Sequence, residues 1–332
     1  MVTFFGMGGI VVGALYPLRP AVRFGLDVSE RVSAAYPTLQ ETTMASTDDP
    51  RPAPPLEVPP ESEHPFFRGE IEAPHRTDPL GSGLVLTIVA LYAASGPLPR
   101  TAMPGILALL LVSTLVGCIV RSPYAVHSGL VTLLSFAVVR IPGILTLWPL
   151  SHVITLASYG AIVWSSPWLR KSSGWYRRGQ VDRTSWVLVV SFATASAIAL
   201  IVWRFSTTID LTSFRSFVPK GVPVWTIPIG IVAFAMLNAT FEEIIWRGVL
   251  MHSLEAAIGP GKWTWLLQGV GFGLWHYSGF PSGWVGVGLA TIFALMMGVL
   301  RIRGRGMLAP WIAHSFADAT IYILVAAMVL AR

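Results

Sequence analysis

Residues 222–247 read VPVWTIPIGIVAFAMLNATFEEIIWR, an apolar run that ends in two adjacent glutamates and an arginine. Its first part, 222–239, holds no ionisable group and is long enough to cross a bilayer as a helix. A charged residue at the centre of a membrane helix costs about 2.5–3.5 kcal/mol on insertion scales. The presence of Glu242, Glu243 and Arg247 in this helix therefore indicates a functional site.

The composition of the whole chain is that of a polytopic membrane protein. Of its 332 residues, 53% are hydrophobic and 12% are charged, whereas a typical soluble domain holds about 25% charged residues. The net charge of +6 comes from arginines in short segments between apolar runs, so it reports membrane topology and not nucleic-acid binding. Cys118 is the only cysteine, which excludes an intrachain disulfide and a multi-cysteine metal site.

The chain divides into three parts: an N-terminal segment (1–79), accessory transmembrane helices (80–222) and a core (223–332). Eleven of the 17 acidic residues fall between positions 27 and 78, in a stretch rich in proline. Such a composition cannot bury a core, so we expect a largely disordered tail there. Residues 3–18 are apolar and fit either a first membrane helix or an interfacial segment.

From Leu80 onward the apolar segments predict an all-α protein with about nine transmembrane helices, the catalytic core lying in the last four. The expected ranges are 81–98, 102–120, 127–149, 152–167, 185–203, 223–249, 263–279, 284–300 and 307–330. Two basic loops, 170–183 and 301–305, are separated by four of these helices, so both should lie at the same side of the membrane. Positive loops stay in the cytoplasm, which predicts a site that is reached from the cytoplasmic side.

Helical geometry divides the first motif into a pair and a single carboxylate. Successive residues turn by about 100° on a helix, so Glu243 and Arg247 share a face while Glu242 points elsewhere. Asn238, the only asparagine in the chain, lies one turn before Glu242. We expect a neutralised pair, Glu243–Arg247, beside a free carboxylate, Glu242. The alternative is a charge cluster that serves helix packing near the membrane interface.

Two later segments add further polar groups. Phe272-Gly-Leu-Trp-His276 places a histidine in the next predicted helix, and His314-Ser-Phe-Ala-Asp318 places two polar residues on one face of the last helix. Taken alone, His276 could be a packing histidine and His314–Asp318 a buried hydrogen-bonded pair. Together with Glu242 they supply a general base and groups able to stabilise an oxyanion.

The order Glu-Glu-x-x-x-Arg, Phe-x-x-x-His, His-x-x-x-Asn/Asp on successive membrane helices resembles the CAAX protease and bacteriocin-processing family (CPBP, or Abi). This family of intramembrane endopeptidases includes the type II CAAX prenyl endopeptidases. The resemblance covers about residues 223–320. It implies that Glu242 activates water with His276, while His314 and Asp318 support the oxyanion.

The resemblance also bears on the last motif position and on cofactors. In the prenyl endopeptidases that this chain resembles, the last motif position is an asparagine, which is an amide donor. Here the position is Asp318, which can donate a hydrogen bond only when it is protonated. Glu243, Arg247 and Asn238 would be supporting residues. The resemblance favours hydrolysis without a catalytic metal or other cofactor. A zinc site would need Glu242, His276 and His314 to converge from three helices.

We therefore expect an intramembrane endopeptidase that cleaves a membrane-anchored or lipidated (CAAX prenylated) peptide in the lipid bilayer and has no nucleic-acid partner. Two alternatives stay open: a metal-dependent membrane hydrolase, and a non-catalytic scaffold, immunity or transport protein. Two observations distinguish the endopeptidase from these alternatives. They are whether Glu242, His276 and His314 meet around a water-accessible cavity, and whether metal is bound there.

Overall fold

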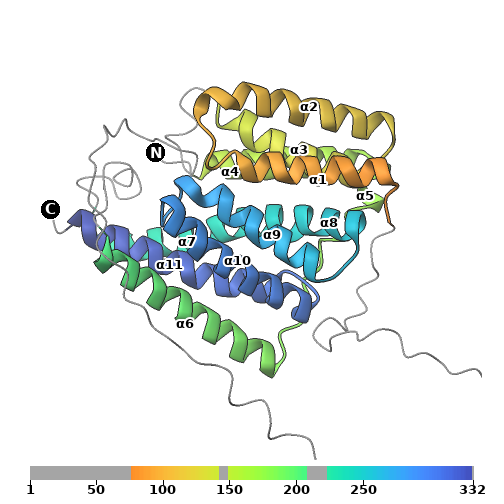
Figure 1. Ribbon diagram of the computed structural model, residues 1–332. Coiled ribbons are helices and arrows are strands. Elements are labelled where there is room, and N and C mark those ends of the chain that lie inside the picture. The colour runs from red at the N-terminus through yellow and green to blue at the C-terminus, as the bar shows by residue number, and fades with distance from the viewer. Residues whose placement is uncertain (1–75, 142–148, 208–222, 331–332) are drawn as a thin grey trace, which may run out of the picture. The chain divides into compact units, whose positions relative to one another are not determined.

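The computed structural model describes residues 76–141, 149–207 and 223–330. Within these ranges the chain forms helices and no strand, which agrees with the predicted all-α class (Figure 1). The apolar segment 3–18 and nearly all of the predicted acidic tail lie outside the described residues.

The principal helices share an apolar composition. They are α1 (Pro79–Ala94), α2 (Met103–Ile119), α3 (Pro123–Val138), α4 (Leu150–Ser165), α6 (Arg183–Ser206), α7 (Ile227–Glu243), α8 (Met251–Ile258), α9 (Lys262–Trp275), α10 (Gly283–Gly304) and α11 (Leu308–Leu330). The remaining elements are shorter: η2 (Arg100–Ala102), α5 (Pro167–Lys171), η4 (Val224–Thr226), η5 (Ile244–Leu250) and η6 (His276–Ser278).

Local caps and prolines determine where several helices begin. The Asp78 carboxylate accepts a hydrogen bond from the Gly81 backbone N–H at 2.6 Å, and Pro79 follows as the first helical residue. Pro123 is likewise the first residue of α3, without a side-chain cap, and it lies four residues before the predicted boundary at 127. Proline is favoured in the first turn because that N–H has no helical partner, so the helix begins earlier than apolar periodicity indicated.

Five of the described helical segments are long and apolar enough to cross a membrane. They are Arg100–Ile119, Arg183–Ser206, Val224–Ile258, Gly283–Gly304 and Leu308–Leu330. The segments Pro79–Ala94, Pro123–Val138 and Leu150–Ser165 are apolar but shorter, and α9 has 14 residues where a full span needs about 20. The chain is therefore a multi-pass membrane protein, but the described residues do not establish nine spans.

The helix that carries the first motif differs from its prediction. Instead of ending near residue 249, it continues to Ile258, and residues Ile244–Leu250 form a π-helical turn between α7 and α8. A π-turn adds one residue per turn and occurs frequently at functional sites. Trp246, in this turn, is fully buried and stacks on Tyr92 of α1 at 5.5 Å between ring centroids.

The two basic loops lie at the same end of the helices, as the sequence predicted. Backbone hydrogen bonds connect them, from the Gln180 N–H to the Gly304 carbonyl at 2.8 Å and from the Met307 N–H to the Arg177 carbonyl at 2.9 Å. Asp182, which caps α6, pairs with Arg303 at 3.3 Å. Hydrogen bonds from Ser185 hold the pKa of the Asp182 carboxyl below its ordinary value.

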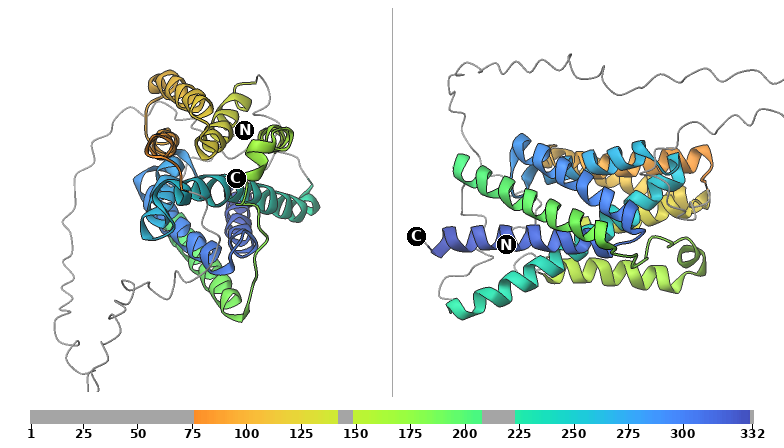
Figure 2. Two further views of the ribbon diagram at one scale, coloured as in Figure 1. Left: turned by 90° about the vertical axis from the view of Figure 1, so that its right-hand side faces the viewer. Right: turned by 90° about the horizontal axis from the view of Figure 1, so that it is seen from below.

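The helices from α6 onward pack on one another, and α6, α7, α10 and α11 lie side by side (Figure 2). α11 packs on α6 and α7, and α10 packs on α9, α6 and α11. Gly269 and Gly273 of α9 face α10, where a Cβ at Gly273 would lie 2.7 Å from the Val287 carbonyl oxygen. The small-residue spacing Gly269-x-x-x-Gly273 therefore serves close helix packing, which brings His276 beside the motif of α7.

Candidate active site

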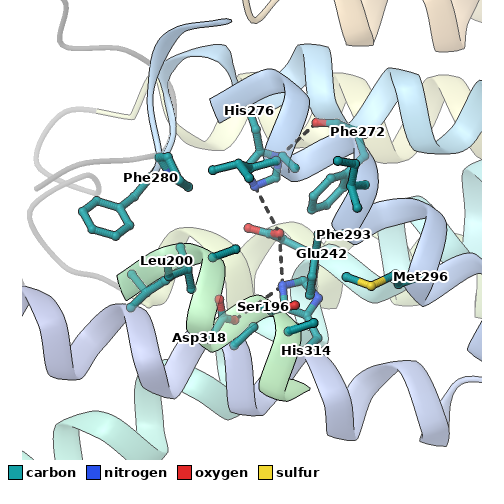
Figure 3. Close-up of a pocket in the computed structure, with 18 of the residues that line it drawn as sticks. Ser196, Leu200, Glu242, Phe272, His276, Phe280, Phe293, Met296, His314 and Asp318 are labelled. Carbon is teal, nitrogen blue, oxygen red and sulfur yellow. Dashed lines mark hydrogen bonds and ion pairs between the residues drawn. The ribbon is translucent and has the colours of Figure 1, made fainter. Parts of the chain in front are cut away.

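Glu242 lies at the centre of the polar cluster, near the end of α7. Its side chain is buried, and its Oε1 accepts a hydrogen bond from Asn238 Nδ2 at 3.0 Å. This contact follows from the one-turn spacing of the two residues on α7. The second oxygen, Oε2, faces the two histidines (Figure 3).

His276 lies directly after α9, in the short turn η6. Its Nδ1 donates to the Phe272 carbonyl at 3.0 Å, and its Nε2 lies 3.5 Å from Glu242 Oε2. The imidazole packs on the Phe272 ring at 4.0 Å between centroids. These contacts fix the ring with Nε2 directed at Glu242.

His314 of α11 approaches the same carboxylate. Its Nε2 lies 3.5 Å from Glu242 Oε2, while its Nδ1 donates to Glu243 Oε1 at 2.7 Å. The bond to Glu243 was not predicted from the sequence, which assigned that carboxylate to Arg247 alone. Glu243 thus connects the first motif to the third.

Asp318 is the fourth predicted site residue, one turn after His314. Its Oδ2 lies 3.6 Å from His314 Nε2, which is beyond hydrogen-bond distance, so the two residues do not form a hydrogen-bonded pair. Instead, Asp318 Oδ2 accepts from Asn238 Nδ2 at 3.2 Å. One amide therefore bridges the carboxylates of Glu242 and Asp318.

Glu243 and Arg247 form the ion pair that their spacing predicted, with 3.0 Å between Glu243 Oε1 and Arg247 Nη1. Both side chains are buried, and the Arg247 side chain is 0% exposed. The guanidinium also lies over the Phe272 ring, at 4.3 Å from its centroid. Arg247 thus packs against the same phenylalanine that holds His276.

These side chains border a cavity of about 240 Å³. Its polar lining residues are Asn238, Glu242, His276, His314, Asp318 and Ser196. The rest of the lining is apolar and comes mainly from α6 and α10, including Leu200, Phe293 and Met296 (Figure 3). The cavity thus combines a group able to activate water with an apolar surface able to accept a substrate chain.

Comparison with known proteins agrees with this geometry. Residues 223–320 match the family model described as type II CAAX prenyl endopeptidase Rce1-like. Over these residues the chain is similar to the CAAX protease (CPBP) family. No curated protein and no solved structure matched the chain.

The CAAX protease match confirms the predicted family and covers the same residues as the motif pattern. The family is one of peptidases that act on membrane-associated substrates. The matched segment is less than a third of the 332-residue chain. Helix α6 contributes to the cavity but lies outside the match.

Charge balance constrains how this buried cluster is protonated. The cluster holds three carboxylates (Glu242, Glu243, Asp318), one guanidinium (Arg247) and two imidazoles (His276, His314). All of these side chains are buried, and uncompensated buried charge is costly. With both imidazoles neutral and all carboxylates ionised, the cluster would carry two excess negative charges. Two further protons, shared among the imidazoles and carboxylates, make it neutral.

Sequence reasoning did not find the contribution of α6 to the cavity. Ala195, Ser196, Ala199 and Leu200 line it, yet they read as ordinary apolar and small residues of a predicted helix. No charge, motif or spacing in 183–206 distinguishes them. They reach the cavity because α6 packs on α10 and α11, which is a tertiary contact.

Proposed function

We propose that this chain is an intramembrane endopeptidase that hydrolyses a peptide bond of a membrane-anchored or lipidated substrate with water activated by Glu242. The observation that supports the proposal most strongly is the convergence of His276 Nε2 and His314 Nε2 on one oxygen of Glu242, each at 3.5 Å, at the wall of a cavity. A non-catalytic scaffold has no need of such a cavity at its charged cluster.

In the proposed reaction, Glu242 takes a proton from a water molecule, which attacks the substrate carbonyl. His276 holds the water together with Glu242, because its Nε2 faces the same carboxylate oxygen. The proton is then delivered to the leaving amine. Burial of the cluster strengthens each of these electrostatic interactions relative to water.

His314 and Asp318 are proposed to support the oxyanion. His314 can donate from Nε2 when it is protonated, since its Nδ1 donates to Glu243. Asp318 can donate only when it carries a proton. Asn238 Nδ2 lies 3.2 Å from Asp318 Oδ2. An amide donor therefore stands beside Asp318, the position at which the prenyl endopeptidases that this chain resembles carry an asparagine.

The apolar cavity wall supports a substrate with an apolar or lipidated segment. A prenylated CAAX peptide is the substrate class named by the matched family, and we propose it, with unprenylated membrane-anchored peptides, as the first to be tested. Metal-dependent hydrolysis is the alternative mechanism. In the described ranges no three His, Cys, Asp or Glu side chains are arranged as a metal site. Whether the activity depends on metal is tested by adding a chelator.

The function is tested with purified protein in lipid nanodiscs and a prenylated CAAX peptide that carries a fluorophore and a quencher near its two ends (the probe peptide). We expect an increase in fluorescence and two peptide products by mass spectrometry, with an unchanged rate after EDTA. Loss of activity in EDTA that zinc restores would favour the metal-dependent mechanism. Absence of cleavage of both the probe peptide and its unprenylated counterpart would contradict the proposed function.

We further propose that the active site is reached from the cytoplasm, because His314 lies in the half of α11 that begins at the basic loop 301–305 and positive loops stay in the cytoplasm. Cys118 is exposed and would be replaced by alanine. In that background, Arg303→Cys is expected to react with a membrane-impermeant maleimide from the cytoplasmic side and Ser282→Cys from the opposite side. Both positions are exposed. The reverse labelling pattern would overturn the orientation and exclude cytoplasmic lipidated peptides as substrates.

A further inference from the structure

Ser196 is the only polar residue among the described cavity-lining residues that lies outside the three motif-bearing segments, α7, α9–η6 and α11. It belongs to α6, which is also outside the residues matched by the family model. The cavity-lining residues of α6 and α10 that Figure 3 also labels, Leu200, Phe293 and Met296, are apolar.

The Ser196 hydroxyl forms no hydrogen bond within the described part of the protein. The residue is 7% exposed, and its Oγ has no hydrogen-bond partner there. A buried serine or threonine in a helix commonly donates to the carbonyl four residues earlier. Ser135 does so at 2.7 Å and Ser315 at 2.8 Å, but Ser196 does not.

A peptide in the cavity would need such a group. Its scissile carbonyl faces Glu242, and its neighbouring backbone amides would lie against the apolar wall. A buried amide without a partner is costly, so one hydroxyl on that wall can determine which backbone group is accepted there. The small side chains of Ala195 and Ala199 on either side of Ser196 leave room for a peptide backbone.

We propose that Ser196 is a substrate-binding residue whose hydroxyl hydrogen-bonds a backbone amide group of the peptide next to the scissile bond. This inference rests on the proposed function. Ser196 would set the register of the peptide against Glu242. It forms no bond to the reacting atoms and takes no part in proton transfer.

The test compares Ser196→Ala with two matched variants. Ser128 of α3 is 0% exposed, its Oγ also has no partner among the described residues, and it does not line the cavity. Ser128→Ala therefore removes the same kind of hydroxyl elsewhere. Ser196→Thr retains a hydroxyl at the cavity wall.

With the probe peptide, Ser196→Ala is expected to raise KM about threefold to tenfold, because one hydrogen bond to the peptide is lost. The kcat should change by less than about twofold. Ser128→Ala should behave as wild type, and Ser196→Thr should recover most of the loss. The Tm of Ser196→Ala should equal or exceed that of wild type, because the removed hydroxyl has no protein partner. A lower Tm that Ser196→Thr does not restore would indicate a structural role and overturn the inference.

A binding measurement separates this inference from the proposed function. The Kd of the probe peptide is measured by fluorescence anisotropy on Glu242→Gln protein with and without Ser196→Ala. We expect Ser196→Ala to raise this Kd by the same factor of about three to ten, which corresponds to the loss of one hydrogen bond. An unchanged Kd and KM in an enzyme that cleaves the peptide would overturn the role of Ser196 alone. A Ser196-dependent Kd without cleavage by wild type would overturn the proposed function alone. Absence of binding would overturn both.

Discussion

Glu242→Gln is expected to lower the rate of peptide hydrolysis by about a hundredfold to ten-thousandfold, the range contributed by a general base. The amide has the size of the carboxylate but cannot take a proton from water. Asn238 Nδ2, now 3.0 Å from Glu242 Oε1, can still donate to the amide oxygen, so the fold should be kept. Initial rates with the probe peptide and the Tm of each protein measure the two effects.

Glu255→Gln provides a control with the opposite pattern. Glu255 of α8 is also buried, but it lies outside the cavity and accepts two hydrogen bonds from Arg301, at 2.8 and 3.2 Å. Its neutralisation should lower the Tm while kcat stays close to that of wild type. A Glu242→Gln protein that retains activity within about tenfold of wild type would rule out Glu242 as the base.

Arg247→Ala is expected to lower the free energy of unfolding by about 3–5 kcal/mol, because it removes the guanidinium that neutralises the buried Glu243 carboxylate and leaves it only the hydrogen bond from His314. The guanidinium contact with the Phe272 ring, at 4.3 Å, is lost at the same time. Since Phe272 also holds His276, we expect the remaining folded protein to have lower activity. Folded yield, size-exclusion profile and Tm are the measurements.

The double variant Glu243→Gln with Arg247→Gln is the matched control. It removes both charges, and the amide oxygen at position 243 can still accept from His314 Nδ1, which is 2.7 Å from Glu243 Oε1 in the structure. Part of the lost stability should therefore return. If Arg247→Ala and Glu243→Gln each express and melt like wild type, the ion pair has no structural role.

Much of the site could be predicted because its key residues repeat on helices at fixed spacing. The four-residue separations of Asn238 from Glu242 and of Glu243 from Arg247 place each pair on one helix face, and both contacts occur at 3.0 Å. Apolar runs likewise indicated the helices, since a membrane-spanning chain must satisfy its backbone within each segment.

Features that depend on contacts between helices could not be predicted. The bond of His314 to Glu243 joins residues 71 positions apart, and the Asn238 bridge to Asp318 spans 80 positions. Neither has a local sequence pattern. The π-turn at Ile244–Leu250 was also missed, because an insertion of one residue per turn leaves the apolar run unchanged. Ser196 reached the cavity only through the packing of α6.

The central claim, that water and not the Glu242 carboxylate itself attacks the peptide bond, is tested most directly by a single turnover in water enriched in heavy oxygen. An excess of wild-type protein cleaves the probe peptide once, and mass spectrometry determines the isotope in the new carboxyl group. Attack by activated water predicts one heavy oxygen in the product of this first turnover. A first product that carries only ordinary oxygen, taken from a protein carboxylate, would contradict the account.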